Sequence, residues 1–423
     1  MSDFSFQPGE AYAAELDARD PVAHYRGRFY IPRSDAGQEC TYLAGHSLGL
    51  QPKSAKGYIE QELEDWARLG VEGHFHGKDP WMPYHRLLTE QTADLVGADR
   101  VEVVVMNSLT VNLHLMMASF YRPTPQRHKI LIERGAFPSD QYAVQSQIRF
   151  HNFDPATSFL ELSPRDGEFC VRLEDIQELI DAQGESIALI LLGGVNYATG
   201  QIFDIAEITR AGHRKGCIVA CDLAHAVGNI PLRLHDWGPD FAIWCSYKYL
   251  NGGPGCVGGC FVHERHSQSR NLPRYAGWWG HDEKIRFQMG PEFRPIAGAE
   301  GWQLSNPPII ALAPLRASME IFAEAGMDRL RTKSGILTAY MEFLLRSKES
   351  AKYSIITPPD PDQRGAQLSI RVREGRGICD RLIAEGVIGD WREPDIYRVA
   401  AVPLYNSYKD VYGFVQRFLM ALS

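Results

Sequence analysis

The chain has 423 residues, of which 44% are hydrophobic and 23% are charged, and its formal net charge is −8. This is the composition of a globular protein, and the length allows two or three domains around a large core. No basic run indicates a nucleic-acid face, and no apolar stretch is long enough to cross a bilayer. The acidic, polar start lacks the apolar core of a signal peptide, so a cytoplasmic location is expected.

The first clear element is a helix over Ala55–Leu69, where apolar residues recur at helical spacing. Near-continuous apolar runs then predict strands over Glu102–Met106, Lys129–Ile132, Ile187–Leu192, Cys217–Cys221, Phe241–Cys245 and Val257–Val262. Helices are predicted between them over Val111–Phe120, Leu173–Ala182 and Ile205–Lys215. Strands of this kind are covered on both faces, and their alternation with helices predicts an α/β protein with a mainly parallel sheet.

The last third of the chain has a different pattern. Helices are predicted over Ile309–Ala325 and Leu337–Arg346, followed by shorter strands and helices over Ala366–Val372, Ile378–Glu385 and Asp410–Leu422. Pro-rich breaks occur at Ser305–Pro308 and Thr357–Gln363. We therefore expect a large domain over 56–305 and a small domain over 306–423, which the N-terminal arm, 1–55, joins.

The eight cysteines form no C-x-x-C pair, and the two C-x3-C pairs, CIVAC and CVGGC, fall in predicted strands. Buried thiols in a reducing compartment are favoured over zinc ligands or disulfides, and no metal site is expected.

Ligands of a parallel α/β sheet lie beyond the carboxyl ends of its strands, so the loops there hold the candidate residues. The segment Asn107–Thr110 opens a helix and would seat a phosphate, although a simple helix cap by Ser108 or Thr110 is the stronger explanation when it is taken alone. After the next strand, Phe137 is placed to stack on a flat ring or to fold back onto the core, and Asp140 lies in the same loop.

Two further loops add charge. Asp222 follows CIVAC and is either a functional carboxylate or a helix cap, and His225 is either functional or a core histidine. Lys248 lies between FAIWC and the glycines of NGGPGCVGG. It is a candidate Schiff-base nucleophile if its amine is desolvated, or else a charge partner for a phosphate or carboxylate.

A phosphate seat, a stacking aromatic, a carboxylate and a lysine at one sheet edge are together what pyridoxal phosphate requires. Its aldehyde forms an imine with a lysine, and its ring nitrogen stays protonated against a carboxylate. One helix-and-strand crossover separates Asp222 from Lys248, which places the two on neighbouring loops.

Several longer motifs resemble those of kynureninases: HSLGLQPK, FPSD, VNYATGQ, DLAHAVGN, WCSYKYLNGGPG, GWWGH, SNPP and RVAAVPLYNS. The resemblance covers nearly the whole chain. It implies the fold of fold-type-I pyridoxal-phosphate enzymes in the aspartate-aminotransferase superfamily, with a mainly parallel seven-stranded sheet in the large domain and a smaller α+β domain. It also implies a homodimer with active sites at the subunit interface, and hydrolytic cleavage of L-kynurenine, or its 3-hydroxy form, to anthranilate, or 3-hydroxyanthranilate, and L-alanine.

The resemblance assigns catalytic roles to Lys248, which carries pyridoxal 5'-phosphate covalently, and to Asp222, which pairs with its ring nitrogen. Tyr247 is the hypothetical general acid and base, with a plain phosphate contact as the alternative. The other residues implied at the cofactor are Leu109, Thr110, Phe137, Pro138, Ser139, Asp140, Gly193, His225, Trp278 and Asn306. Those implied at the substrate, some of them from the partner subunit, are His74, His281, Ser305, Asn306 and Arg398. Arg398 is the expected clamp for the substrate α-carboxylate.

Two positions depart from the family. His46 stands where asparagine is usual, and Ala198 stands where a second tyrosine is expected to reach the phosphate. One lost hydrogen bond of about 0.5–3 kcal/mol would weaken cofactor binding without removing activity.

Three other functions are compatible with parts of this pattern. An aminotransferase or a cysteine desulfurase would have the same fold, but the desulfurase needs a cysteine on a mobile loop, which does not stand out here. A non-catalytic cofactor-binding protein could lose the substrate clamp, whereas Lys248 and Arg398 are both present.

Overall fold

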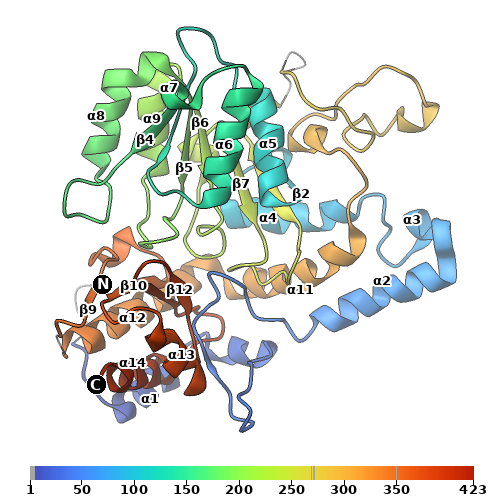
Figure 1. Ribbon diagram of the computed structural model, residues 1–423. Coiled ribbons are helices and arrows are strands. Elements are labelled where there is room, and N and C mark those ends of the chain that lie inside the picture. The colour runs from blue at the N-terminus through green and yellow to red at the C-terminus, as the bar shows by residue number, and fades with distance from the viewer. Residues whose placement is uncertain (1–4, 268, 270–271, 349) are drawn as a thin grey trace.

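The structure is a computed structural model that describes residues 5–267, 269, 272–348 and 350–423. Its centre is a seven-stranded sheet with the order β2-β8-β7-β6-β5-β3-β4 (Figure 1). The strands are β2 Val103–Met106, β3 Lys129–Glu133, β4 Phe159–Leu162, β5 Ile187–Gly193, β6 Ile218–Asp222, β7 Phe241–Cys245 and β8 Gly258–Val262. Strand β8 runs in the opposite direction to the other six strands, which are parallel to one another. The prediction of a mainly parallel seven-stranded sheet is therefore confirmed.

Both faces of this sheet are buried, as the apolar runs predicted. Successive side chains of a strand point to opposite faces, and accordingly Val103 and Val105 join one hydrophobic cluster while Val104 and Met106 join another. The helices of this part are α2 Ala55–Leu69, α3 Gly73–His76, α4 Thr89–Val96, α5 Leu109–Phe120, α6 Pro138–Phe150, α7 Pro155–Ser158, α8 Leu173–Gln183, α9 Ile205–Arg214 and α10 Leu234–Trp237.

A second, antiparallel sheet has the order β12-β13-β10-β9. Its strands are β9 Tyr353–Ile355, β10 Gln367–Val372, β12 Asp390–Arg392 and β13 Ile396–Ala400. The helices that accompany it are α1 Glu10–Ala18, α12 Met327–Arg346, α13 Gly377–Ala384 and α14 Tyr408–Leu422. Between the two sheets runs α11, Ile309–Ala325, which packs against α2 (Figure 1).

The N-terminal arm lies beside the C-terminal part of the chain. Strand β1, Thr41–Tyr42, pairs in parallel with β11, Val387–Ile388, and α1 packs on α14. The two ends of the chain therefore lie at the same side of the molecule (Figure 1).

Several elements were not predicted from the sequence, namely α1, α3, α4, α6, α7, α10, β1, β4, β9, β11, β12 and β13, and one predicted helix starts earlier than expected. Strand β4 was not predicted, because it is a short edge strand with only one fully buried residue. Helix α12 begins at Met327, ten residues before the predicted start at Leu337. Its first turns are polar, and Lys333 is buried there with its Nζ 2.7 Å from Asp20 and donating a 2.8 Å hydrogen bond to the carbonyl of Pro403.

The predicted burial of the cysteines holds for seven of the eight thiols, and Cys170 is half-buried. Cys217 and Cys256 lie just before β6 and β8 instead of inside them. Among the described residues, no helix has the length and apolarity needed to cross a membrane.

Candidate active site

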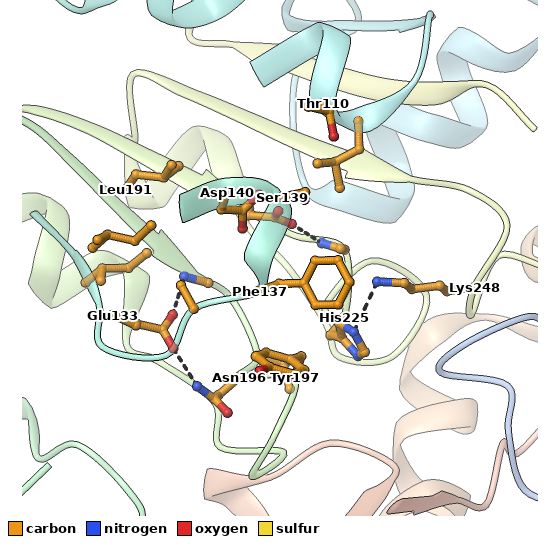
Figure 2. A pocket seen from close by; sticks show the side chains of 18 of the residues that line it. Thr110, Glu133, Phe137, Ser139, Asp140, Leu191, Asn196, Tyr197, His225 and Lys248 are labelled. Atoms are coloured by element: carbon orange, nitrogen blue, oxygen red, sulfur yellow. Dashed lines mark hydrogen bonds between the residues drawn. The ribbon is translucent and has the colours of Figure 1, made fainter. Parts of the chain in front are cut away.

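The loops after five strands of the large sheet meet in one cavity. Leu109 and Thr110 open α5 after β2, and Phe137 ends the loop after β3 (Figure 2). Ser139 and Asp140 line the cavity from the first turn of α6, so the expectation that Asp140 lies in the loop is wrong. The ends of β5, β6 and β7 contribute the remaining polar wall, which contains Gly193, Asn196, Tyr197, Asp222, His225, Tyr247 and Lys248. The loop residues named from the sequence thus lie together.

The structure does not bring every predicted site residue to this cavity. Pro138 is the first residue of α6 and lies between two lining residues without lining the cavity itself. Those that lie elsewhere in this chain are His74, Trp278, His281, Ser305, Asn306 and Arg398. Ser305 and Asn306 are exposed before α11, and the Trp278 ring is 42% exposed.

Two of these distant histidines have partners of their own. The His74 ring packs edge-on against Trp81 with centroids 5.3 Å apart. His281 is buried, and its Nδ1 accepts a hydrogen bond of 3.0 Å from the backbone N–H of Arg294.

Lys248 projects into the cavity between an aromatic ring and an imidazole. Its Nζ lies 3.1 Å from His225 Nε2 and 5.8 Å from the centroid of the Phe137 ring (Figure 2). Burial, together with the charge of Lys248, holds the pKa of His225 well below its usual value, so the imidazole is neutral. An ammonium group only donates, so Nε2 accepts and the proton of His225 lies on Nδ1, which has no partner within the described chain.

Asp222 and Asp140 form a carboxyl pair in the wall of the cavity. Burial raises the pKa of Asp222, and burial followed by the neighbouring Asp222 charge raises that of Asp140 well above its usual value. Because their side chains share a hydrogen bond, one proton between them is the favoured state. Asp222 Oδ1 accepts a 2.7 Å bond from Ala224 N in a turn, and no helix starts there, so the helix-cap explanation is wrong.

Glu133, which the sequence analysis missed, fixes the loop after β5. This buried carboxylate at the end of β3 accepts hydrogen bonds from Gly193 N, at 2.8 Å, and from Asn196 Nδ2, at 2.5 Å. Asn196 Oδ1 in turn accepts from the backbone of Ala198, so the alanine is held by its main chain. The available signal was the charged residue Glu133 directly after the apolar run at 130–132.

Arg398 connects the small sheet to this loop. It is buried on β13, where Asp390 of β12 lies directly opposite, and its Nη2 lies 2.5 Å from Asp390 Oδ2. Its Nη1 donates a 2.6 Å hydrogen bond to the carbonyl of Tyr197, which lines the cavity. Beside them His46 is fully buried, and neither ring nitrogen has a hydrogen-bond partner within the described chain.

These residues fit pyridoxal phosphate. The N-terminus of α5 opens on the cavity at Leu109, and neither Ser108 nor Thr110 caps it, so its first N–H groups are available to a phosphate. The Phe137 ring is 43% exposed and offers a face for stacking. Asp222 would offer a carboxylate to the ring nitrogen, and Lys248 would offer an amine to the aldehyde.

The fold is shared with solved enzymes. The cysteine desulfurase CsdA from Escherichia coli superposes with a TM-score of 0.75 at 17% identity, covering 95% of this chain and 98% of that one. The cystine C–S lyase C-DES gives a TM-score of 0.74 at 17% identity, covering 90% of this chain and 97% of that one, and another C-DES structure holds glycine covalently linked to its PLP cofactor. At this identity the likeness shows the fold alone, and it confirms the fold-type-I prediction.

The sequence relatives are much closer. A family model for the kynureninase C-terminal domain matches residues 330–418. The kynureninase of Myxococcus xanthus is 60% identical over 98% of this chain and 97% of its own length. The kynureninase of Koribacter versatilis is 68% identical over the full length of both chains. The chain therefore belongs to the kynureninase family.

Proposed function

We propose that the protein hydrolyses L-kynurenine, or 3-hydroxy-L-kynurenine, to L-alanine and anthranilate, or 3-hydroxyanthranilate, with pyridoxal 5'-phosphate as its cofactor. The main support for this proposal is that one cavity is lined by Lys248, Asp222, Phe137 and the uncapped start of α5. The chain that forms this cavity is 68% identical to a kynureninase. The reaction class is hydrolysis of a carbon–carbon bond next to a ketone.

The geometry of the cavity supports the following roles for the residues proposed to bind the cofactor. Lys248 Nζ would hold the cofactor covalently, Asp222 would face its ring nitrogen and Phe137 would stack on the ring. The first turn of α5, at Leu109 and Thr110, would bind the phosphate.

When bound, pyridoxal phosphate supplies an electron sink for the bonds at the substrate α-carbon. Lys248, once the substrate amine has replaced it, is placed to move the α-proton, and the neutral His225 imidazole 3.1 Å away orients its Nζ. Burial raises the pKa of the Tyr247 hydroxyl, which therefore stays protonated and suits a proton donor at the substrate ketone.

Arg398 is proposed to bind the substrate α-carboxylate. Its guanidinium is preorganised by Asp390 and the Tyr197 carbonyl, and its buried Nε has no hydrogen-bond partner in the described chain. A planar guanidinium binds a carboxylate through two parallel hydrogen bonds.

We further propose a homodimer whose partner subunit completes the site. His74, Trp278, Ser305 and Asn306 lie away from the cavity of their own chain. Large apolar side chains are exposed on the same two regions, namely Trp66, Val71 and Phe75 around α2 and α3, and Tyr275, Phe287 and Met289 near Trp278. Exposed apolar groups of this size support a protein interface.

Two further proposals concern the domain division and the cellular location. The division into a large domain over 56–305 and a small domain made of 1–55 and 306–423 is supported by the separate sheets and by the pairing of β1 with β11. A cytoplasmic location is supported by eight free thiols. The cysteine desulfurase and aminotransferase alternatives are not favoured, because the close relatives are kynureninases.

The purified holoenzyme should release a fluorescent product from kynurenine or its 3-hydroxy form, together with alanine in equal amount. Lys248→Ala should lower turnover at least about 100-fold, because the proton-moving amine is lost. Product analysis by chromatography and fluorescence checks both points. A keto acid in place of alanine, or full turnover by Lys248→Ala, would contradict the proposed function.

Arg398→Lys should raise the KM for kynurenine about 10- to 100-fold, since one charged hydrogen bond contributes about 1.5–3 kcal/mol. The cofactor dissociation constant should change much less, because Arg398 does not line the cavity. Steady-state kinetics and cofactor titration separate the two effects. If the affinities for kynurenine and for the cofactor fall equally, the variant has a folding defect, and the result counts against Arg398 as the binding site of the α-carboxylate.

Mixed dimers test the shared site. Lys248→Ala and Asn306→Leu subunits are each expected to be inactive alone. If Asn306 acts across the interface, hybrids contain one intact site and a statistical mixture regains about a quarter of wild-type activity. Co-expression with two different affinity tags yields the hybrid for assay. A dimeric but inactive hybrid would place both residues in the same site of one chain.

The carboxyl pair predicts a pH dependence for the cofactor-free protein. Both folded pKa values are raised, so the native state holds a proton that the unfolded state has lost, and stability falls as pH rises from about 4 through the raised values. Asp140→Asn removes one charge and should flatten this decline, which gives a higher melting temperature than wild type at pH 8. Thermal unfolding of the wild-type and Asp140→Asn apoproteins from pH 4 to 8 measures this pH dependence. If the two curves of melting temperature against pH are parallel, the pair is not coupled.

A further inference from the structure

A second cluster of ligating side chains lies at the edge of the large sheet opposite to Lys248. Glu102 immediately precedes β2, His235 lies in α10 shortly before β7, and His263 immediately follows the antiparallel β8. Because Val103 of β2 pairs with Phe261 of β8, these three positions meet at the amino ends of the parallel strands. Their ligand atoms all lie within 4.8 Å of one another.

The spacing of these atoms is that of a metal site. Both imidazoles approach the same carboxylate oxygen: His235 Nδ1 lies 3.1 Å and His263 Nδ1 lies 3.5 Å from Glu102 Oε1. In tetrahedral zinc sites a metal–ligand distance of about 2.0–2.1 Å places neighbouring ligand atoms about 3.3–3.4 Å apart. Asp99 Oδ2, 3.8 Å from His235 Nδ1, is available as a fourth ligand.

We propose that Glu102, His235 and His263 bind a divalent transition metal of the zinc type, with Asp99 or a water molecule as the fourth ligand. Two imidazoles and a carboxylate are a donor set that zinc accepts. The metal would join three segments that are far apart in the sequence and far from the active-site cavity, so its role would be structural.

The carboxylate is already oriented by the backbone. Glu102 is fully buried, its Oε1 accepts a 2.7 Å hydrogen bond from Glu264 N, and its Oε2 accepts a 2.9 Å hydrogen bond from Asp99 N. Each carboxylate oxygen has a second lone pair that remains for a metal. Such outer hydrogen bonds hold a ligand in place and strengthen its binding to the metal.

The two imidazoles differ in what their Nδ1 atoms already contact. That of His263 accepts a long 3.3 Å hydrogen bond from Arg265 N. That of His235 lies 3.1 Å from both oxygens of Glu102, a contact that a bound metal would replace.

A nearby cluster provides a matched control. Asp240 contacts His213 Nε2 through Oδ2, at 2.9 Å, and His266 Nε2 through Oδ1, at 2.8 Å. The two imidazoles thus lie at opposite oxygens, and the Arg265 guanidinium, 2.9 Å from Oδ1, already neutralises this carboxylate. We expect no metal there.

The test uses the metal-stripped holoenzyme without an affinity tag. Zinc titration calorimetry and the visible absorption of Co²⁺ should show one tetrahedral site in wild type and in His213→Gln. His235→Gln and His263→Gln should each weaken binding at least about tenfold. Zinc should raise the melting temperature of wild type and His213→Gln but not of the two site variants.

Turnover of kynurenine confirms that each variant is folded, because none of these residues lies at the active-site cavity. Undiminished zinc binding by both site variants, an octahedral Co²⁺ spectrum, or a loss of binding in His213→Gln alone would overturn the proposal.

Discussion

The burial of two carboxyl groups side by side is the constraint on which the site depends. Asp222 and Asp140 cannot both be ionised in the wall of the cavity without a compensating positive charge. Lys248 is the cation that lowers the pKa of both, and a protonated cofactor ring nitrogen would be a second one. Without the cofactor the pair keeps one shared proton beside Lys248, and a protonated ring nitrogen next to Asp222 would favour the ionised form of that carboxyl group. The fold can hold this arrangement because the loops rest on a rigid, doubly covered sheet.

The same cavity is linked to the small sheet through the Tyr197 carbonyl, which accepts hydrogen bonds from Arg398 of β13 and Gln367 of β10. Arg398 is held by the facing Asp390 and reaches across to the Tyr197 carbonyl, while Glu133 holds the other end of that loop through Gly193 and Asn196. A group bound at Arg398 would thus act on Tyr197 directly. With the proposed role of Arg398, this geometry would connect substrate binding at the small sheet with the wall of the cofactor cavity.

The sequence predicted the elements whose signal is local. Uninterrupted apolar runs identified six of the seven strands of the large sheet, and the residues just after them, such as Phe137, Asp222 and Lys248, proved to share one cavity. The exposed edge strand β4 carried no such signal. The early start of α12 was not predicted, because the buried Lys333 forms an ion pair with Asp20. That partner is far away in the sequence and cannot be identified from a local pattern. Glu133, Asp390 and the cluster of Glu102, His235 and His263 were missed for the same reason, because their roles arise only when distant segments meet.

The pairing of the N-terminal arm with the far end of the chain has a consequence for biosynthesis. Thr41 and Tyr42 leave the ribosome long before their partners Val387 and Ile388 are translated. Throughout that interval Leu43 and the apolar face of α1, which end up in the same cluster as α14, have no surface to cover them. The strands of the large sheet are all made meanwhile and can assemble first. The apolar residues of the N-terminal arm therefore stay uncovered until α14 has been translated.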